Sequence, residues 1–458
     1  MPLIRLDRLP GARIALGGRP LAIGRDVSLT LRNAGPWSIA NAPMVFAGWG
    51  VVDPKRGYDA YRGVDMRGKV AVLLANDPDF EAGRDMGFGG RALVLAGRTG
   101  TKIAAAVKAG AAGVIFIHEE AAYSFPFAQF GNTIGVPSMT YAPIQPSQFG
   151  FSAVVRRDIA EGLLRKSGFT LAALKVRARS PHFRAISLRA SADVSGVNKA
   201  TPFTSHNVIA KLTGSTRPNE YVLYGAHWDA NGNNGADATG DAIRNGAIDN
   251  ATGTSELLEI ARAFAAGKRP ERTVVFAAWT AEEKGLLGSE WFAGHPLIAL
   301  ELTAAVINLD PHLVLPVARS LELIGPGKTD PEQRLIIAAN VDGLRVVAES
   351  IPEAGWYFRS DHLPFAQRGV PAIAFRAGRD LVKGGFAEGA RAVAAFNALC
   401  YHQPCDEFAS AWTFAGAGQE ATAAYRLGLD VANMRGWPSW NAGNEYLSVR
   451  ENSATARR

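Results

Sequence analysis

The sequence predicts an α/β fold in which a mixed sheet is flanked by helices, and three observations support this class. The chain has 458 residues, enough for roughly two to four domains. Apolar runs of strand length alternate with helical segments over residues 183–458, whereas residues 20–180 are rich in Gly, Val and Ala. The two regions are therefore expected to form separate domains.

The C-terminal region, residues 183–458, shows the more regular alternation of strands and helices. We expect a helix over residues 256–266, because Leu257, Ile260 and Phe264 recur on one helical face. The expected strands are Tyr221–Ala226, Thr273–Trp279, Ala304–Asn308 and Pro371–Phe375. These strands are almost continuously apolar, which is typical of a sheet covered by helices on both faces.

The N-terminal region reads as a small α/β or β-rich module. Residues 70–75 and 113–118 are expected strands, and residues 102–110 are an expected helix ended by glycine. The region shows no obvious cluster of catalytic residues.

Composition excludes several classes of protein. The net charge is +7, but the basic residues are scattered and form no block interleaved with aromatic residues, so no nucleic-acid partner is predicted. No apolar run reaches the roughly 18 residues of a membrane span, and the N-terminus lacks the apolar core of a signal peptide. With only two cysteines, any metal must be bound by His, Asp and Glu.

Polar residues follow the expected strands at the edge where α/β sheets bind ligands. They are His227 and Asp229, Glu282 and Glu283, and Asp310, together with Asp249 before the expected helix. Clustered carboxylates repel one another, and a bound dication removes that cost. Because imidazole and carboxylate ligands suit zinc, the pattern predicts a zinc site at this edge.

Two short patterns suggest separate roles within that site. In His227-Trp-Asp229, the carboxylate is placed to orient a metal-binding imidazole. In the adjacent pair Glu282-Glu283, one carboxylate would bind metal while its neighbour acts as general base.

Taken together, the motifs resemble the co-catalytic di-zinc aminopeptidases, a family that includes the glutamate carboxypeptidase II group. The matching stretches are 226–229 (AHWD), 245–253 (NGAIDNATG), 280–289 (TAEEKGLLGS), 307–310 (INLD), 359–365 (RSDHLPF) and 401–406 (YHQPCD). The resemblance implies a zinc exopeptidase that uses two Zn²⁺ ions and acts on peptide substrates. The oligomeric state stays open.

The resemblance also implies a domain division. Residues 1–25 would hold the first strand region of the catalytic domain, residues 26–182 an inserted, β-rich protease-associated domain, and residues 183–458 the zinc peptidase domain. The insert is similar to protease-associated domains at residues 46–50 (FAGWG) and 68–72 (GKVAV).

The resemblance implies a role for each site residue. His227 and Asp310 would bind one zinc, Glu283 and His402 the other, and Asp249 would bridge both. Glu282 would be the general base, Asp229 would orient His227, and Tyr401 is a candidate hydrogen-bond donor to the oxyanion. His362 is a weaker candidate than His402 for the last ligand, and His312 is a candidate for lining the substrate pocket.

The sequence leaves more than one activity open. An aminopeptidase is favoured over a carboxypeptidase, but Arg244, Arg359, Arg376 and Arg379 lie near the motifs, and arginines bind carboxylates. Glutaminyl cyclisation with one zinc and a non-catalytic, receptor-like scaffold are also compatible with the fold.

Two local features complete the expectations from the resemblance. A disulfide between Cys400 and Cys405 would fix the loop of His402 and imply an oxidising compartment, hence a periplasmic or secreted protein. A cis peptide bond between Asp249 and Asn250 would aim the Asp249 carboxylate between the two metals.

Overall fold

The computed structural model divides the chain into two compact units and describes residues 1–457 except 83, 124, 132–135, 146 and 311–312. Unit 1 comprises Met1, residues 204–350 and residues 356–458, and unit 2 comprises residues 2–203 with residues 351–355. No helix in the described part of the chain combines the length and the apolarity that crossing a membrane requires.

Unit 1 is built on a seven-stranded mixed sheet with the order β13-β17-β14-β18-β21-β19-β20. Its strands are β13 (Val208–Leu212), β14 (Arg217–His227), β17 (Arg272–Trp279), β18 (Thr303–Asn308), β19 (Ser320–Ile324), β20 (Arg345–Ala348) and β21 (Ala372–Ala377), and a separate hairpin joins β15 (Gly232–Asn233) to β16 (Ile243–Arg244). Strands β14, β17, β18 and β21 run parallel, whereas β13 and β19 pair antiparallel with their neighbours β17 and β21. The predicted α/β fold with a mixed sheet is confirmed.

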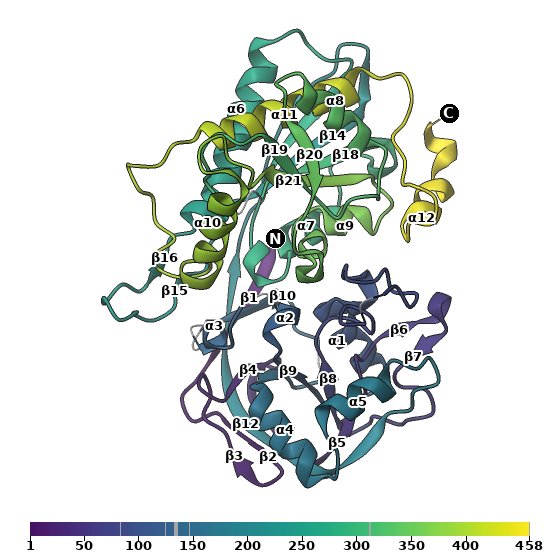
Figure 1. Cartoon of the computed structure of the whole chain (residues 1–458), viewed down its shortest axis with the longest axis vertical. Helices are drawn as coiled ribbons and strands as arrows, with labels where there is room; N and C mark the ends of the chain where they lie inside the picture. The colour runs from purple at the N-terminus through teal and green to yellow at the C-terminus, as the bar shows by residue number, and fades with distance from the viewer. Residues whose placement is uncertain (83, 124, 132–135, 146, 311–312, 458) are drawn as a thin grey trace. The chain divides into compact units, whose positions relative to one another are not determined.

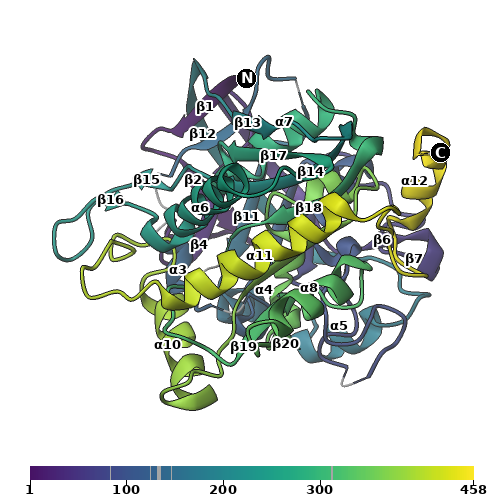
Figure 2. The same cartoon turned by 90° about the horizontal axis from the view of Figure 1, so that it is seen from above.

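Helices cover the sheet of unit 1 on both faces. They are α6 (Gly253–Ala266), α7 (Leu287–Gly294), α8 (Pro331–Asn340), α9 (Leu363–Ala366), α10 (Gly385–Leu399), α11 (Ala415–Asn433) and α12 (Leu447–Asn452). Figures 1 and 2 show α6, α8 and α11 together on one face of the sheet. The apolar stripe of α6 explains its placement, because Phe264 packs against Tyr224 and Phe276 of two central strands.

Unit 2 contains a ten-stranded sheet whose main path is β10-β1-β12-β5-β8-β9-β11-β4. Its strands are β1 (Pro2–Arg8), β2 (Arg13–Leu16), β3 (Arg19–Pro20), β4 (Val27–Leu31), β5 (Gly35–Phe46), β8 (Val70–Leu74), β9 (Gly113–Ile117), β10 (Ser138–Tyr141), β11 (Phe151–Val155) and β12 (Ile186–Thr204), and a separate hairpin joins β6 (Val52–Asp53) to β7 (Tyr58–Asp59). Its helices are α1 (Thr99–Lys108), α2 (Glu120–Tyr123), α3 (Ala128–Gly131), α4 (Arg157–Lys166) and α5 (Leu171–Ala178). Apolar residues of α4 and α5 pack with the strands in one buried core.

The division into units differs from the predicted domain boundaries, which placed residues 1–25 and residues 183–458 in the catalytic domain. Strand β1 pairs with β10, and β2 pairs with β12, so residues 2–25 extend the sheet of unit 2. The long strand β12 belongs to the same sheet through its pairing with β5. Pairing between strands so distant in sequence depends on the tertiary fold, which local apolar patterns do not reveal.

Candidate metal centre

Strand ends in unit 1 bring the predicted site residues to one edge of the sheet. Strand β14 ends at His227, which lies beside Trp279 at the end of the parallel strand β17. On its other side, β14 pairs in parallel with β18, and Asp310 follows the end of β18 by two residues. Because parallel strands end at the same edge, their following residues converge there.

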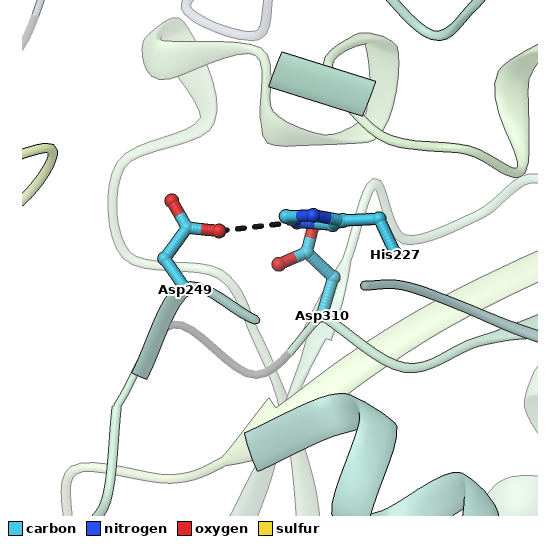
Figure 3. Close-up of side chains that lie close together, drawn as sticks. All are labelled: His227, Asp249 and Asp310. Carbon is cyan, nitrogen blue, oxygen red and sulfur yellow. Dashed lines mark hydrogen bonds and ion pairs between the residues drawn. The ribbon is translucent and has the colours of Figure 1, made fainter. Parts of the chain in front are cut away.

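The first ligand group consists of His227, Asp249 and Asp310, whose nitrogen and oxygen atoms all lie within 4.8 Å of one another. Figure 3 shows the three side chains converging, with His227 Nε2 at 3.1 Å from Asp249 Oδ1. The His227 side chain is 1% exposed and that of Asp249 5% exposed. Two members of the group are therefore almost closed to solvent, whereas Asp310 is partly exposed.

The second ligand group consists of Asp249, Glu283 and His402, so Asp249 belongs to both groups. His402 Nε2 lies 3.2 Å from Asp249 Oδ2 and 3.2 Å from Glu283 Oε2. The two oxygens of Asp249 thus face different histidines. A carboxylate placed in this way is suited to bridge two metal ions.

The donor atoms fit zinc in type and in arrangement. His227 Nδ1 lies 3.0 Å from the backbone oxygen of Asp229, which can only accept a hydrogen bond. In the neutral ring Nδ1 therefore carries the proton, and Nε2 has a free lone pair. That lone pair would face the Asp249 carboxylate directly, which is repulsive unless a proton or a metal cation lies between the two atoms. Nitrogen and carboxylate oxygen ligands on both sides of Asp249 match the preference of Zn²⁺.

The electrostatics of these side chains point in the same direction. Burial disfavours a charged ring at His402, but Glu283 and Asp249 outweigh it and raise the pKa of His402 to about 10. Burial likewise opposes charge at His227, but Glu282 and nearby aspartates raise its pKa well above the ordinary value. Burial would raise the pKa of Asp249, but the two histidines hold it well below its usual range. The cluster therefore attracts positive charge.

Glu282 and Glu283 lie in a strained turn that Asp229 holds in place. The flanking residues Ala281 and Leu286 have φ angles of 56° and 63°, in the left-handed region that costs non-glycine residues roughly 1–2 kcal/mol. The Asp229 carboxylate accepts hydrogen bonds from the backbone N–H groups of Glu282 at 3.0 Å and Glu283 at 3.3 Å. These bonds fix the turn that presents both glutamates.

The predicted role of Asp229 toward His227 is carried mainly by its backbone. Its carboxylate oxygen lies 3.7 Å from His227 Nδ1, farther than its own carbonyl oxygen at 3.0 Å. The carboxylate instead accepts from the Glu282 and Glu283 amides. Asp229 thus positions both the imidazole and the glutamate turn.

Asp406 positions the backbone of Asp249. This residue lies in one of the motifs found in the sequence, but no role was predicted for it. The Asp406 carboxylate accepts from the backbone N–H of Ile248 at 2.8 Å and of Asp249 at 3.1 Å. The peptide bond between Asp249 and Asn250 is cis, which confirms that prediction. The Asn250 side chain donates to the backbone oxygen of Leu309, next to Asp310.

Asp310 is oriented by Ser360, whose role was not predicted from sequence. The Ser360 hydroxyl donates to Asp310 Oδ2 at 2.6 Å, and the Asn308 side chain donates to Ser360 Oγ at 2.8 Å. The signal was present in the motif Arg359-Ser-Asp-His362, but its sequence does not show which residue faces the ligand. Hydroxyl donors of this kind fix a carboxylate for metal binding.

The loop that carries His402 is closed by the predicted disulfide between Cys400 and Cys405, with a Cα–Cα distance of 5.1 Å. His402 itself has a φ of 59°, and its ring stacks on that of Tyr401 at 3.9 Å between centroids. Tyr401 is buried, and burial raises the pKa of its phenol well above the ordinary value. The phenol is therefore a protonated donor beside a ligand.

The remaining histidine candidates lie elsewhere. His362 is buried against Tyr357, at 4.6 Å between ring centroids, and burial lowers its pKa to about 4. It belongs to neither of the ligand groups found among the described residues. His312 lies outside the described residues.

Glu282 interacts electrostatically with His227 and Asp310 of the first ligand group and with Glu283 of the second, but it belongs to neither group. Burial raises its pKa well above the ordinary value, and Asp361, Glu283 and Asp310 add to this, whereas His227 lowers it. A carboxyl group of raised pKa next to a metal site is suited to take up and release a proton. The assignment of Glu282 as the general base stays a prediction.

Known proteins resemble this chain in sequence and fold. Residues 207–425 match the sequence profile of Peptidase family M28. A probable zinc metalloprotease of Pyrenophora teres f. teres is 44% identical over 109 residues, covering 24% of this chain and 23% of that protein. Aminopeptidase NAALADL1 of Mus musculus is 36% identical over 152 residues, covering 32% of this chain and 18% of that protein.

The fold likeness extends over more of the chain than the sequence matches do. The structure of an aminopeptidase from Aneurinibacillus sp. strain AM-1 superposes with a TM-score of 0.52 at 18% identity, covering 94% of this chain and 83% of that one. By contrast, the sequence matches span about a quarter or less of the length of the curated relatives.

Proposed function

We propose that this chain, whose residues 207–425 belong to peptidase family M28, is a zinc-dependent exopeptidase that releases residues from the amino end of peptides. The observation that carries the proposal is the pair of ligand groups that share Asp249. Glu282 belongs to neither group but interacts electrostatically with members of both. Two-metal sites of this kind serve hydrolysis of peptide bonds.

The proposed ligands follow the two groups. His227 and Asp310 would hold one zinc, Glu283 and His402 would hold the second, and Asp249 would contribute to both. The short distances from both Asp249 oxygens to the two histidines support this division.

The chain's own residues then perform the proton transfers. Zinc, when bound, supplies Lewis acidity that polarises a peptide carbonyl and lowers the pKa of a water molecule. The Glu282 carboxylate accepts a proton from the attacking water and delivers it to the leaving amine. The Tyr401 hydroxyl donates a hydrogen bond to the oxygen that gains charge at the scissile carbon.

The competing functions differ in what they require of the site. A receptor-like scaffold would not need an intact ligand set, and this chain keeps all five proposed ligands in the two groups. Glutaminyl cyclisation uses one zinc and releases ammonia, so a second zinc and release of a free amino acid would argue against it. A carboxypeptidase would require a free carboxylate but no free amine.

The test combines metal analysis with a set of short peptides. We expect two zinc ions per chain and release of the first amino acid from peptides with a free amine. N-acetylated forms of the same peptides should be hydrolysed much more slowly. Hydrolysis of both forms at equal rates would favour a carboxypeptidase, and no hydrolysis by the zinc-loaded protein would refute the peptidase function.

The disulfide supports a proposal on location and domain type. Because stable disulfides form in oxidising compartments, we place the protein in the periplasm or outside the cell. Unit 2 is proposed to be a protease-associated domain, on the motifs at residues 46–50 and 68–72. Fractionation of the producing cells tests the location.

A further inference from the structure

Four arginines near the motifs are candidates to bind a substrate carboxylate, and three of them already have other partners. Arg376 and Arg379 lie 2.7 Å and 3.5 Å from the carboxylate of Glu322. Arg244 donates to two backbone oxygens of its own loop. These three guanidinium groups therefore stabilise the structure around the site.

Arg359 differs from the other three in its partners, which are an aromatic ring and a side-chain hydroxyl. Its guanidinium lies over the ring of Trp356, at 4.3 Å from the centroid, and its Nη2 donates to the Tyr401 hydroxyl at 3.2 Å. The residue is only partly buried. Stacking on an aromatic ring fixes the plane of a guanidinium and leaves its edge free for a carboxylate.

Tyr401 connects this guanidinium to the metal centre. Its ring stacks on the proposed ligand His402 at 3.9 Å, and its hydroxyl contacts Arg359. The proposed position of the scissile carbonyl is beside the same hydroxyl. Arg359 therefore lies one side chain away from the reacting bond.

We propose that Arg359 binds the free α-carboxylate of the residue that follows the scissile bond, so that dipeptides with free ends are the preferred substrates. The inference rests on the proposed exopeptidase function. A planar guanidinium can donate two parallel hydrogen bonds to one carboxylate, which gives both attraction and orientation.

Bond lengths agree with this assignment. The carboxylate carbon of a dipeptide is separated from the scissile carbonyl carbon by only three bonds, which together span about 4 Å at most. A group bound beside Tyr401 is within that reach. In a longer peptide the terminal carboxylate lies at least one residue, about 3.8 Å, farther along the chain.

The experiment compares Leu-Gly with its C-terminal amide, Leu-Gly-NH2, on the zinc-loaded full chain. We expect kcat/KM for the free acid to exceed that for the amide by about 10- to 100-fold, as for hydrogen bonds to a charged group. Arg359→Gln should remove this preference by slowing hydrolysis of the acid, while the amide changes by less than about threefold. Arg359→Lys should retain part of the preference for the free acid, since lysine keeps the positive charge but cannot donate two parallel hydrogen bonds to one carboxylate.

Arg391→Gln is the matched control, because Arg391 is an exposed arginine that pairs with Glu388. It should leave both substrates unchanged. Equal rates for acid and amide in the unaltered protein would overturn the carboxylate assignment while leaving the peptidase function intact. Equal loss on both substrates in Arg359→Gln and Arg359→Lys, with zinc content retained, would also overturn it, since the arginine would then act only through Tyr401. Failure to hydrolyse either substrate would refute the peptidase function together with the inference.

Discussion

The two ligand groups share Asp249 but are built in different ways. In the first group, His227 and Asp310 follow neighbouring parallel strands, and the His227 side chain is 1% exposed. In the second group, Glu283 lies in a single 3-10 turn (Glu282–Lys284) and His402 in a loop, and the His402 side chain is 33% exposed. The sheet therefore positions one group, whereas a strained turn and a disulfide position the other.

Because their supports differ, the two groups need not hold their metals equally well. Strand backbones deep in a sheet open only with large parts of the fold, whereas loops open locally at low free-energy cost. The metal bound by the second group should therefore exchange more readily than the metal bound by the first. Variants that disturb one group at a time can test this contrast.

The largest effect is expected at Glu282, which interacts electrostatically with members of both groups but belongs to neither. Glu282→Gln should keep two zinc ions and the fold but lower kcat by on the order of 10²–10⁴, because an amide cannot accept the water proton. KM should change little. Steady-state kinetics with metal analysis measure both quantities.

Glu283→Gln is the paired variant, since the neighbouring glutamate belongs to the second group. It should lose zinc from that group first, and excess zinc should restore part of the activity. Loss of zinc in Glu282→Gln but not in Glu283→Gln would show that the two roles are reversed.

Metal removal tests the contrast directly. Titration with a chelator should release zinc in two steps. The group of Glu283 and His402 should lose its zinc at a roughly tenfold lower chelator concentration than the group of His227 and Asp310. This is the size of effect that supporting residues have on metal affinity. Activity should fall with the first step. The assignment predicts that His402→Ala abolishes that early step, and a single step in the unaltered protein would show that the groups hold zinc equally.

The disulfide should matter for the second group alone. Replacing Cys400 and Cys405 together by serine should weaken zinc binding there by about 10-fold and lower the free energy of unfolding by about 2 kcal/mol, as expected for so short a loop. The His227 group should keep its zinc. Unfolding in urea and metal analysis of the same samples measure these effects, and equal loss at both groups would contradict the contrast.

The smallest effect is expected at Ser360, which supports the first group through Asp310. Ser360→Ala removes the hydroxyl that donates to Asp310 Oδ2, and should weaken zinc binding by that group by no more than about 10-fold. Ser360→Thr keeps a hydroxyl and serves as the control, and metal analysis after dialysis measures both variants. A larger loss at the second group than at the first would be inconsistent with the geometry.

Much of the catalytic unit could be predicted from sequence, because its strands are buried on both faces. The expected strands over residues 221–226, 273–279 and 304–308 correspond to β14, β17 and β18, and the helix over 256–266 corresponds to α6. Strand β12 was not predicted, because few of its 19 residues are buried and its sequence has little apolar continuity. The attachment of residues 2–25 to unit 2 depends on pairings with distant strands and has no local signal.

The proposed ligands could be selected from sequence because each follows a strand or belongs to a motif, but their supporting contacts could not. Ser360 and Asp406 both lie in recognisable motifs, yet nothing in the sequence shows that Ser360 donates to Asp310 or that Asp406 accepts from the Asp249 amide. Among the four arginines, only the three-dimensional structure separates Arg359 from those paired to Glu322.

The hydrogen bond from the Asp249 amide to Asp406 joins residues 157 positions apart, and this has a consequence for synthesis of the chain. At about 5–20 residues per second, a ribosome needs roughly 10 to 30 seconds to pass from Asp249 to Asp406. During that interval the nascent chain has His227 and Asp249 but neither His402 nor the carboxylate that anchors Asp249. The complete set of ligands and supports around the shared aspartate can therefore form only after most of the catalytic unit has been translated.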